Sequence, residues 1–218
     1  VSAGALFGVN YLSGQAGRAI RYNKRYNRDK NYMGLRPLLR EGNLFSTRYA
    51  YDLVPRKLDP FDDDAFQKSG VPFYAVVTDV DTGLPRYIRV TSVFEQMDAL
   101  RASGSMPFVS RPVLLDGRRY LAGGVSDSIP FRWMSAQGYD NLIVGLTREA
   151  GYRKTPINPA RLRLLGMRSP ALARRLARRH DDYNRALEEL ERWQAEGRAF
   201  VVRPSRKTPI SRIETDPD

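Results

Sequence analysis

The sequence predicts an α/β domain with a mainly parallel sheet, because short apolar runs alternate along it with segments of helical periodicity. Its 218 residues are enough for one such domain with a continuous core, so we expect a single domain over residues 1–218. Hydrophobic residues make up 42% and charged residues 28%, and no stretch approaches the roughly 18 apolar residues of a membrane-spanning helix. We therefore expect a water-soluble globular protein.

The first part of the chain is predicted to be helical. Apolar residues recur at helical spacing over residues 2–22, which predicts one helix that begins abruptly. Two more helices are expected over residues 34–39 and 45–53. Residues 60–66 resemble a loop that caps a further helical turn.

The middle of the chain is predicted to form two hairpins and a helix. Residues 72–78 are rich in aromatic and β-branched side chains, and with residues 87–90 they predict the first hairpin. A helix is expected over residues 93–102. Residues 112–121 predict two short strands that turn at Asp116-Gly117.

The last third predicts two strands joined by a long crossover helix. Residues 141–146 and 200–204 are apolar runs typical of buried parallel strands. The longest helical pattern begins between them at Ser169-Pro170, a good N-cap and first-turn pair. One stripe of that helix is apolar and is most simply a core face: Leu172, Leu176, Tyr183, Leu187, Leu190 and Trp193.

The charge of the chain favours anionic partners. The 36 Lys and Arg residues exceed the 24 Asp and Glu residues, which gives a net charge of +12 that attracts either nucleic acid or an anionic membrane. No DNA-binding motif is present and the basic, aromatic tract over residues 21–32 is short, so we expect no specific nucleic acid. A set of arginines either grips anionic headgroups or forms a solvated face: Arg161, Arg163, Arg168, Arg174, Arg175, Arg178 and Arg179.

The absence of cysteine excludes disulfides, thiolate metal sites and cysteine nucleophiles. Residues 1–6 lack the basic start and the cleavage site of a signal peptide. We therefore expect a cytoplasmic protein, and its basic charge allows a peripheral contact with an anionic membrane. The oligomeric state does not follow from the sequence.

A candidate nucleophile stands at the start of the chain. Val1-Ser2-Ala3-Gly4 matches the second half of the sharp strand-to-helix turn that exposes a catalytic serine in α/β hydrolases. Small residues after Ser2 allow close packing of the helix, and a helix N-terminus stabilises a developing negative charge. The alternative is that Ser2 is the N-cap of an ordinary helix.

Two later segments make this pattern specific. Residues 102–108 read Ala-Ser-Gly-Ser-Met-Pro-Phe, and Ala122-Gly123-Gly124 is followed by Pro130. In this order and spacing the chain resembles the bacterial patatin-like phospholipases, which show Gly-x-Ser-x-Gly, then Ala-Ser-x-x-x-Pro, then Asp-Gly-Gly or Asp-Gly-Ala before a proline. Residues 11–14 and 78–83 agree as well, so the resemblance covers nearly the whole chain.

The resemblance implies a three-layer α/β/α sandwich of the patatin type and a lipid acyl hydrolase with a Ser/Asp dyad. Ser2 would attack an ester of a phospholipid or lysophospholipid, an aspartate at position 122 would take its proton, and water would release the acyl enzyme. The Ala3 N–H would donate to the oxyanion, and Gly4, Gly123 and Gly124 belong to the family's motifs. No metal or organic cofactor is implied.

The sequence departs from the family in two places. Ala122 stands where the family has its aspartate, and alanine cannot accept a proton, so the chain as written is expected to be nearly inactive. An engineered inactivation, a natural inactive homologue and a replacement base at Asp127 are the alternatives. The family's first strand and glycine-rich oxyanion loop are expected before Val1, outside this sequence. Ala3 would then be the one remaining oxyanion donor, and losing a donor costs about 3 kcal/mol.

Other polar residues have simpler explanations. His180 follows an arginine-rich helical stretch and is expected to be a solvated helix residue. Two acidic groups lack the spacing of a calcium loop: residues 62–64, and Asp79 with Asp81. We expect them to be carboxylates of helix starts and turns. The alternative function for the whole chain is a non-catalytic protein of the patatin fold that binds an anionic membrane or nucleic acid through its basic surface.

Overall fold

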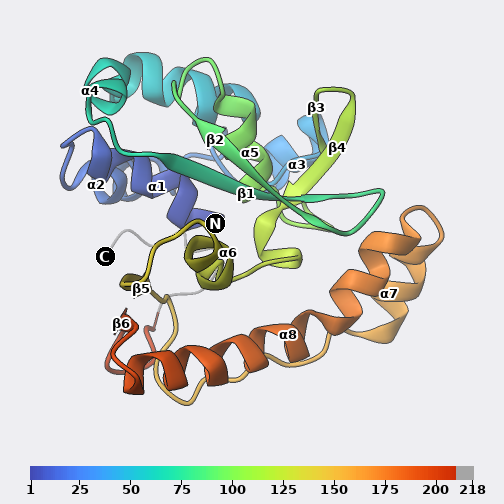
Figure 1. The fold of residues 1–218 in the computed structure, drawn as a ribbon. Coiled ribbons are helices and arrows are strands. Elements are labelled where there is room, and N and C mark those ends of the chain that lie inside the picture. The colour runs from blue at the N-terminus through green and yellow to red at the C-terminus, as the bar shows by residue number, and fades with distance from the viewer. Residues whose placement is uncertain (210–218) are drawn as a thin grey trace. The chain divides into compact units, whose positions relative to one another are not determined.

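The computed structural model describes residues 1–209, which form two compact units (Figure 1). Unit 1 holds Val1–Val80 and Leu84–Gly124. Unit 2 holds Asp81–Gly83 and the described part of Val125–Ser211. Both units contain helices and strands, so the α/β class is confirmed, and each unit is described by itself.

Unit 1 begins with two helices where the sequence predicted one. α1 spans Ala3–Leu12 and α2 spans Arg18–Tyr26. Gly14 and Gly17 lie between the helices and have φ angles of 69° and 75°. A right-handed helix cannot continue through residues with positive φ angles. The single helix over residues 2–22 was therefore wrong, because two glycines in the left-handed region interrupt the apolar pattern.

Three further helical segments follow. α3, Leu35–Glu41, agrees with the prediction for residues 34–39. η1, Tyr49–Leu58, begins later than predicted and has the wider π-type hydrogen bonding, with Pro55 inside it. Proline cannot donate a backbone hydrogen bond, which explains an irregular ladder there. Asp62 caps α4, Asp63–Lys68, by accepting from the N–H of Ala65, as the loop and helical turn predicted for residues 60–66 require.

Four strands form the sheet of unit 1 in the order β2-β1-β4-β3 (Figure 1). They are β1, Phe73–Asp79; β2, Pro85–Val90; β3, Val113–Leu115; and β4, Arg118–Ala122. Both predicted hairpins are confirmed. Asp116 and Gly117 have φ angles of 50° and 74°, the pair of positive angles that a type I′ hairpin turn requires.

Every strand pair in this sheet is antiparallel. The prediction of a mainly parallel sheet is therefore wrong for the four-stranded sheet of unit 1. The connections explain two of the three pairs, because the strands of each hairpin, β1–β2 and β3–β4, are joined by a short turn and must run in opposite directions. The antiparallel pairing of β1 with β4 is a long-range contact that no short connection dictates.

The core of unit 1 lies between the sheet and its helices. α5, Met97–Gly104, starts later than the predicted 93–102 and packs against α1, β1 and β4. Aromatic and aliphatic side chains from α1, α4, α5 and β1 form one cluster, which includes Ala5, Val9, Phe66, Ala75 and Leu100. This packing fixes the first turn of α1 against α5 and β1.

Unit 2 contains the two strands that were predicted to be joined by a long crossover helix. β5, Leu142–Gly145, and β6, Ala199–Val202, pair in parallel, and α7, Pro159–Gly166, and α8, Pro170–Ala195, connect them. The crossover prediction is confirmed. The strands are less buried than predicted, since the side chain of Ile143 is 80% exposed and that of Phe200 is 67% exposed.

The apolar stripe of α8 is a core face, as predicted. Leu187 and Leu190 are buried against Phe131, the first residue of α6, which spans Phe131–Ala136. The rings of Trp193 and Phe131 pack edge-on, with their centroids 4.8 Å apart. Within residues 1–209, no helix combines the length and the apolar composition needed to cross a bilayer.

Candidate functional site

Ser2 occupies a strained turn directly before α1. Its φ of 52° and ψ of −125° lie where an L-residue is rarely found, and such a conformation costs on the order of 1–3 kcal/mol. Its side chain makes no capping hydrogen bond to the helix. Ser2 is therefore not the ordinary N-cap that formed the alternative, whose backbone would be extended and whose hydroxyl would accept from the first turn.

A buried serine of α5 holds this turn in place. The N–H of Ser2 donates to Oγ of Ser103 at 3.0 Å, and the same Oγ donates to the carbonyl of Val76 at 2.7 Å. Ser103 is completely buried, so its hydrogen bond to Val76 lies away from water, whereas the bond from Ser2 is partly buried. Ser103 thus ties the backbone of Ser2 to the middle of β1.

Ala122 is held at the end of β4 by the same part of β1. It pairs with Val77, the residue after Val76, and its carbonyl accepts from Oγ1 of Thr78 at 2.8 Å. Its N–H donates to the carbonyl of Ser105, which follows α5, at 2.8 Å. Ala122 is 6% exposed, so a side chain placed there lies largely within the protein.

Gly123 completes this junction by allowing two backbones to approach. A Cβ at Gly123 would lie 2.1 Å from the carbonyl oxygen of Val76, which is the oxygen that Ser103 contacts. Only glycine fits against that carbonyl. The structure therefore brings the turn of Ser2 and the strand end of Ala122 to neighbouring residues of β1, from positions about 120 residues apart.

The substitution Gly123→Ala is expected to lower the free energy of unfolding by about 3 kcal/mol, the upper end of the usual cost of overpacking, because backbone atoms must move to relieve the clash. Thermal denaturation followed by circular dichroism measures the change. Gly4→Ala is the matched control, since a Cβ there meets nothing within 4 Å and Ala favours a helix. An equal effect of the two substitutions would contradict this account.

Ser103→Ala is expected to lower the free energy of unfolding by about 1–3 kcal/mol, because it leaves the Ser2 N–H and the Val76 carbonyl without their buried partner. Urea denaturation measures this loss. Ser205→Ala, at an exposed position, serves as the control and is expected to stay within about 0.5 kcal/mol of the parent. Matching midpoints for all three proteins would show that these hydrogen bonds contribute nothing.

The comparison with known families decides between the interpretations of this arrangement. The family model described as patatin-like phospholipase matches residues 1–133, more than half of the chain. The chain belongs to the patatin-like phospholipase family. Within this family match lie the Ser2 turn, the segment that contains Ser103, and the Ala122-Gly123 strand end.

Two further similarities extend beyond the patatin-like region. A second family model, a domain of unknown function called DUF6363, matches residues 169–218, which begin next to α8. An Escherichia coli K12 protein, printed as uncharacterized protein YjjU, is 30% identical over 158 residues. That alignment covers 71% of this chain and 44% of the relative, so the patatin-like chain spans less than half of the length of this relative.

Among the other candidates, the first-turn position of Ala3 is as expected. Ala3 is the first residue of α1, and within residues 1–209 its N–H has no hydrogen-bond partner. Gly4 does not need to be glycine for packing among the described residues, contrary to the expectation of close approach there. Asp127 and His180 lie in unit 2, and the His180 side chain is only 22% exposed, less than a solvated residue would be.

The acidic residues considered as metal ligands have structural partners. Asp63 accepts from Oγ of Ser92 and from the N–H of Val93, and Asp79 pairs with Arg118 at 3.0 Å. No group of three or more His, Asp or Glu side chains suited to a metal occurs in the part of the chain that the structure describes. Asp62 is a helix-start carboxylate, as expected, whereas Asp63 and Asp79 make contacts between segments far apart in the chain.

A cavity of about 540 Å³ in unit 1 lies against α5. Tyr51 lines it, and the Tyr51 hydroxyl would lie 3.6 Å from a Cβ at Gly104, the residue after Ser103. Burial raises the pKa of Tyr51 to about 12, so its hydroxyl stays neutral. Asp52 and Asp98 also line the cavity, and each pairs with an arginine of its own helix.

Sequence reasoning missed Ser103 and Thr78 as parts of this site. Both stand in segments that the family resemblance singled out, but neither was given a role. Their contacts are long-range hydrogen bonds to the backbones of Val76 and Ala122, which no local pattern reveals.

Proposed function

We propose that this protein is a lipid acyl hydrolase whose nucleophile is Ser2 and whose base belongs at position 122. One observation carries the proposal. The strained Ser2 turn and the end of β4 are both fixed on residues 76–78 of β1, which supports a base at position 122 acting on the Ser2 hydroxyl. Because Ala122 accepts no proton, the chain as written is nearly inactive.

The mechanism follows from these positions. The Ser2 hydroxyl attacks the ester carbonyl while its proton passes to the carboxylate at position 122, and the bond to the leaving alcohol then breaks as that alcohol receives the proton. The negative charge that develops on the carbonyl oxygen lies near the N-terminus of α1, where the Ala3 N–H is available to donate. Water, activated by the same carboxylate, then releases the fatty acid from Ser2.

The substrate class of the proposal is an ester of a phospholipid or a lysophospholipid. The family membership supports it, since patatin-like phospholipases are the family that residues 1–133 match. The proposed hydrolase domain covers residues 1–218. The reaction as proposed requires no metal or organic cofactor, because a serine nucleophile and a carboxylate base supply the chemistry.

A fluorophosphonate probe tests the nucleophile. The Ala122→Asp variant is expected to label at Ser2, identified by mass spectrometry of the modified peptide, and the doubly substituted Ser2→Ala, Ala122→Asp protein is expected not to label. Labelling at another serine, or none in a folded Ala122→Asp protein, would remove Ser2 from this role.

A second candidate is a non-catalytic protein that retains the patatin fold and binds anionic surfaces. The alanine at position 122 favours this candidate. A protein without the base has lost turnover but keeps its net charge of +12. This candidate gains if a folded Ala122→Asp protein neither labels nor hydrolyses esters.

A further inference from the structure

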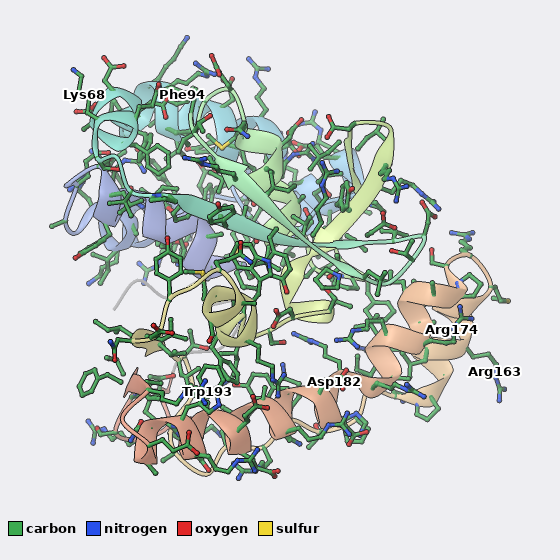
Figure 2. All side chains as sticks on the ribbon, in the orientation of Figure 1. Lys68, Phe94, Arg163, Arg174, Asp182 and Trp193 are labelled. Atoms are coloured by element: carbon green, nitrogen blue, oxygen red, sulfur yellow. The ribbon has the colours of Figure 1, made fainter. Side chains whose placement is uncertain are left out.

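The basic residues of unit 2 are concentrated in one stretch. Residues 150–180 contain nine Lys and Arg residues and no Asp or Glu. The following residues 181–196 contain six Asp and Glu residues against two Arg. The charge of this region therefore changes sign within α8, near Asp182, which Figure 2 labels along that helix.

The basic stretch folds into a helical hairpin. α7 packs beside the N-terminal part of α8, where a Cβ at Gly166 would lie 3.6 Å from that of Ala173 (Figure 1). Arg163 of α7 and Arg174 of α8 both extend from this end of unit 2, whereas Trp193 lies at the other end of α8 (Figure 2).

Five arginines of this hairpin have no carboxylate partner within residues 1–209 and are exposed: Arg161, Arg163, Arg168, Arg174 and Arg178. Arg175, by contrast, turns to Asp182 at 2.9 Å and to the carbonyl of Ser126. The five free guanidinium groups are thus available to an external anion.

Two large apolar side chains stand among these arginines. Leu164 is 65% exposed and Met167 is 73% exposed. Leu162 and Leu165, on the other side of α7, are partly covered, and no residue of α7 is buried. α7 therefore buries little of its apolar surface in the protein core. It exposes an apolar strip between basic residues.

The charge pattern does not serve the stability of α8. A helix dipole is positive at the N-terminus, so cations are favourable near the C-terminus and anions near the N-terminus. α8 has the opposite arrangement, with four arginines among residues 170–180 and the acidic residues after them. A binding role for the basic end explains an arrangement that the helix itself disfavours.

We propose that the α7–α8 hairpin docks on an anionic lipid membrane, with Leu164 and Met167 entering the headgroup region and the five arginines contacting lipid phosphates. Charge complementarity points to an anionic partner, and exposed aliphatic side chains between the arginines point to a membrane, because apolar insertion with basic flanks is how peripheral helices bind bilayers. Single-stranded nucleic acid would instead need aromatic platforms beside the arginines.

Vesicle binding tests this docking without any dependence on catalysis, since the protein with Ala122 is used. Sedimentation with vesicles of equal parts phosphatidylglycerol and phosphatidylcholine is compared with pure phosphatidylcholine vesicles. The parent is expected to bind only the anionic vesicles, and more weakly as salt is raised. A variant with Arg161→Gln, Arg163→Gln and Arg168→Gln is expected to bind about a hundredfold more weakly, because each basic residue near such a surface contributes roughly fivefold.

Two further variants decide the interpretation. Arg36→Gln, Arg40→Gln and Arg89→Gln together remove three exposed arginines of unit 1 and are expected to leave binding within a few-fold of the parent. Leu164→Gln with Met167→Gln is expected to reduce binding at least tenfold, which a purely electrostatic surface would not show. Equal binding by the hairpin arginine variant and the unit 1 variant would overturn the proposal. So would unchanged binding after the apolar substitutions together with full competition by a single-stranded RNA oligonucleotide.

Discussion

Ala122→Asp is expected to raise kcat/KM for a short-chain p-nitrophenyl ester by about 10²–10⁴-fold, because it supplies the general base that the Ser2 hydroxyl lacks. The strand end that carries position 122 is already fixed to β1 by its pairing with Val77 and by the hydroxyl of Thr78. The new carboxylate therefore starts from a positioned backbone, and the gain is not limited by a mobile loop. Steady-state hydrolysis by the product of the whole gene measures it.

Two controls separate base catalysis from a change in shape. Ala122→Asn has nearly the size of aspartate but accepts no proton, so it is expected to stay at the activity of the parent. Ser2→Ala added to Ala122→Asp is expected to return the rate to that level. An Ala122→Asp protein that melts normally and hydrolyses no ester would end the proposal of a Ser/Asp dyad at these positions.

Asp59→Asn is expected to lower the free energy of unfolding by about 3–5 kcal/mol, the cost of breaking a buried ion pair. The Arg18 side chain is almost fully buried and lies 3.3 Å from the Asp59 carboxylate, between the rings of Tyr22 and Phe61. Without the carboxylate, the Arg18 charge keeps only neutral partners, which include the side chain of Asn10. Chemical denaturation of the two proteins at neutral pH measures the difference.

The exposed pair of Asp52 and Arg56 provides the control for this substitution. Both side chains are at least half exposed, so Asp52→Asn is expected to cost less than about 1 kcal/mol. A similar loss for Asp52→Asn and Asp59→Asn would show that burial of the Arg18 charge contributes little.

The stabilisation from Asp59 also has a predicted pH dependence. Hydrogen bonds from Arg21 hold the pKa of Asp59 below its ordinary value near 3.9. The unfolded state therefore binds the proton first as the pH falls, so the contribution is complete above about pH 5 and is lost as the pH drops through the folded pKa. The difference in unfolding free energy between the parent and Asp59→Asn is expected to shrink below about pH 4.

Local structure was largely predictable from the sequence. Both hairpins, the Asp116-Gly117 turn and the long α8 depend on residues that are close together in the chain, and each was predicted within a few residues. The family motifs also pointed to Ser2 and Ala122 as candidates, whereas Ser103 and Thr78 were given no role. Their roles as nucleophile and base stay predictions, as does the single domain over residues 1–218.

Tertiary relations were not predictable in the same way. Whether neighbouring strands run parallel or antiparallel depends on which strands pair. In this sheet β1 pairs with β4, which lies more than 40 residues away in the sequence. The break between α1 and α2 places Arg18 where it reaches Asp59, a contact 41 residues apart. The role of Ser103 rests on one oxygen that both accepts from Ser2 and donates to Val76. Such long-range contacts leave no periodic signal.

The backbone of Ser2 also bears on how this protein distributes its stability. A residue held at a φ of 52° stores energy that the rest of the fold must offset, here through buried partners such as Ser103. Relaxation of that turn would lower its local conformational energy. It would also move the Ser2 hydroxyl from its present position. Under the proposed role of Ser2, a higher melting temperature and reactivity therefore oppose each other at the start of α1, and we expect selection for a higher melting temperature to change the Ser2 turn first.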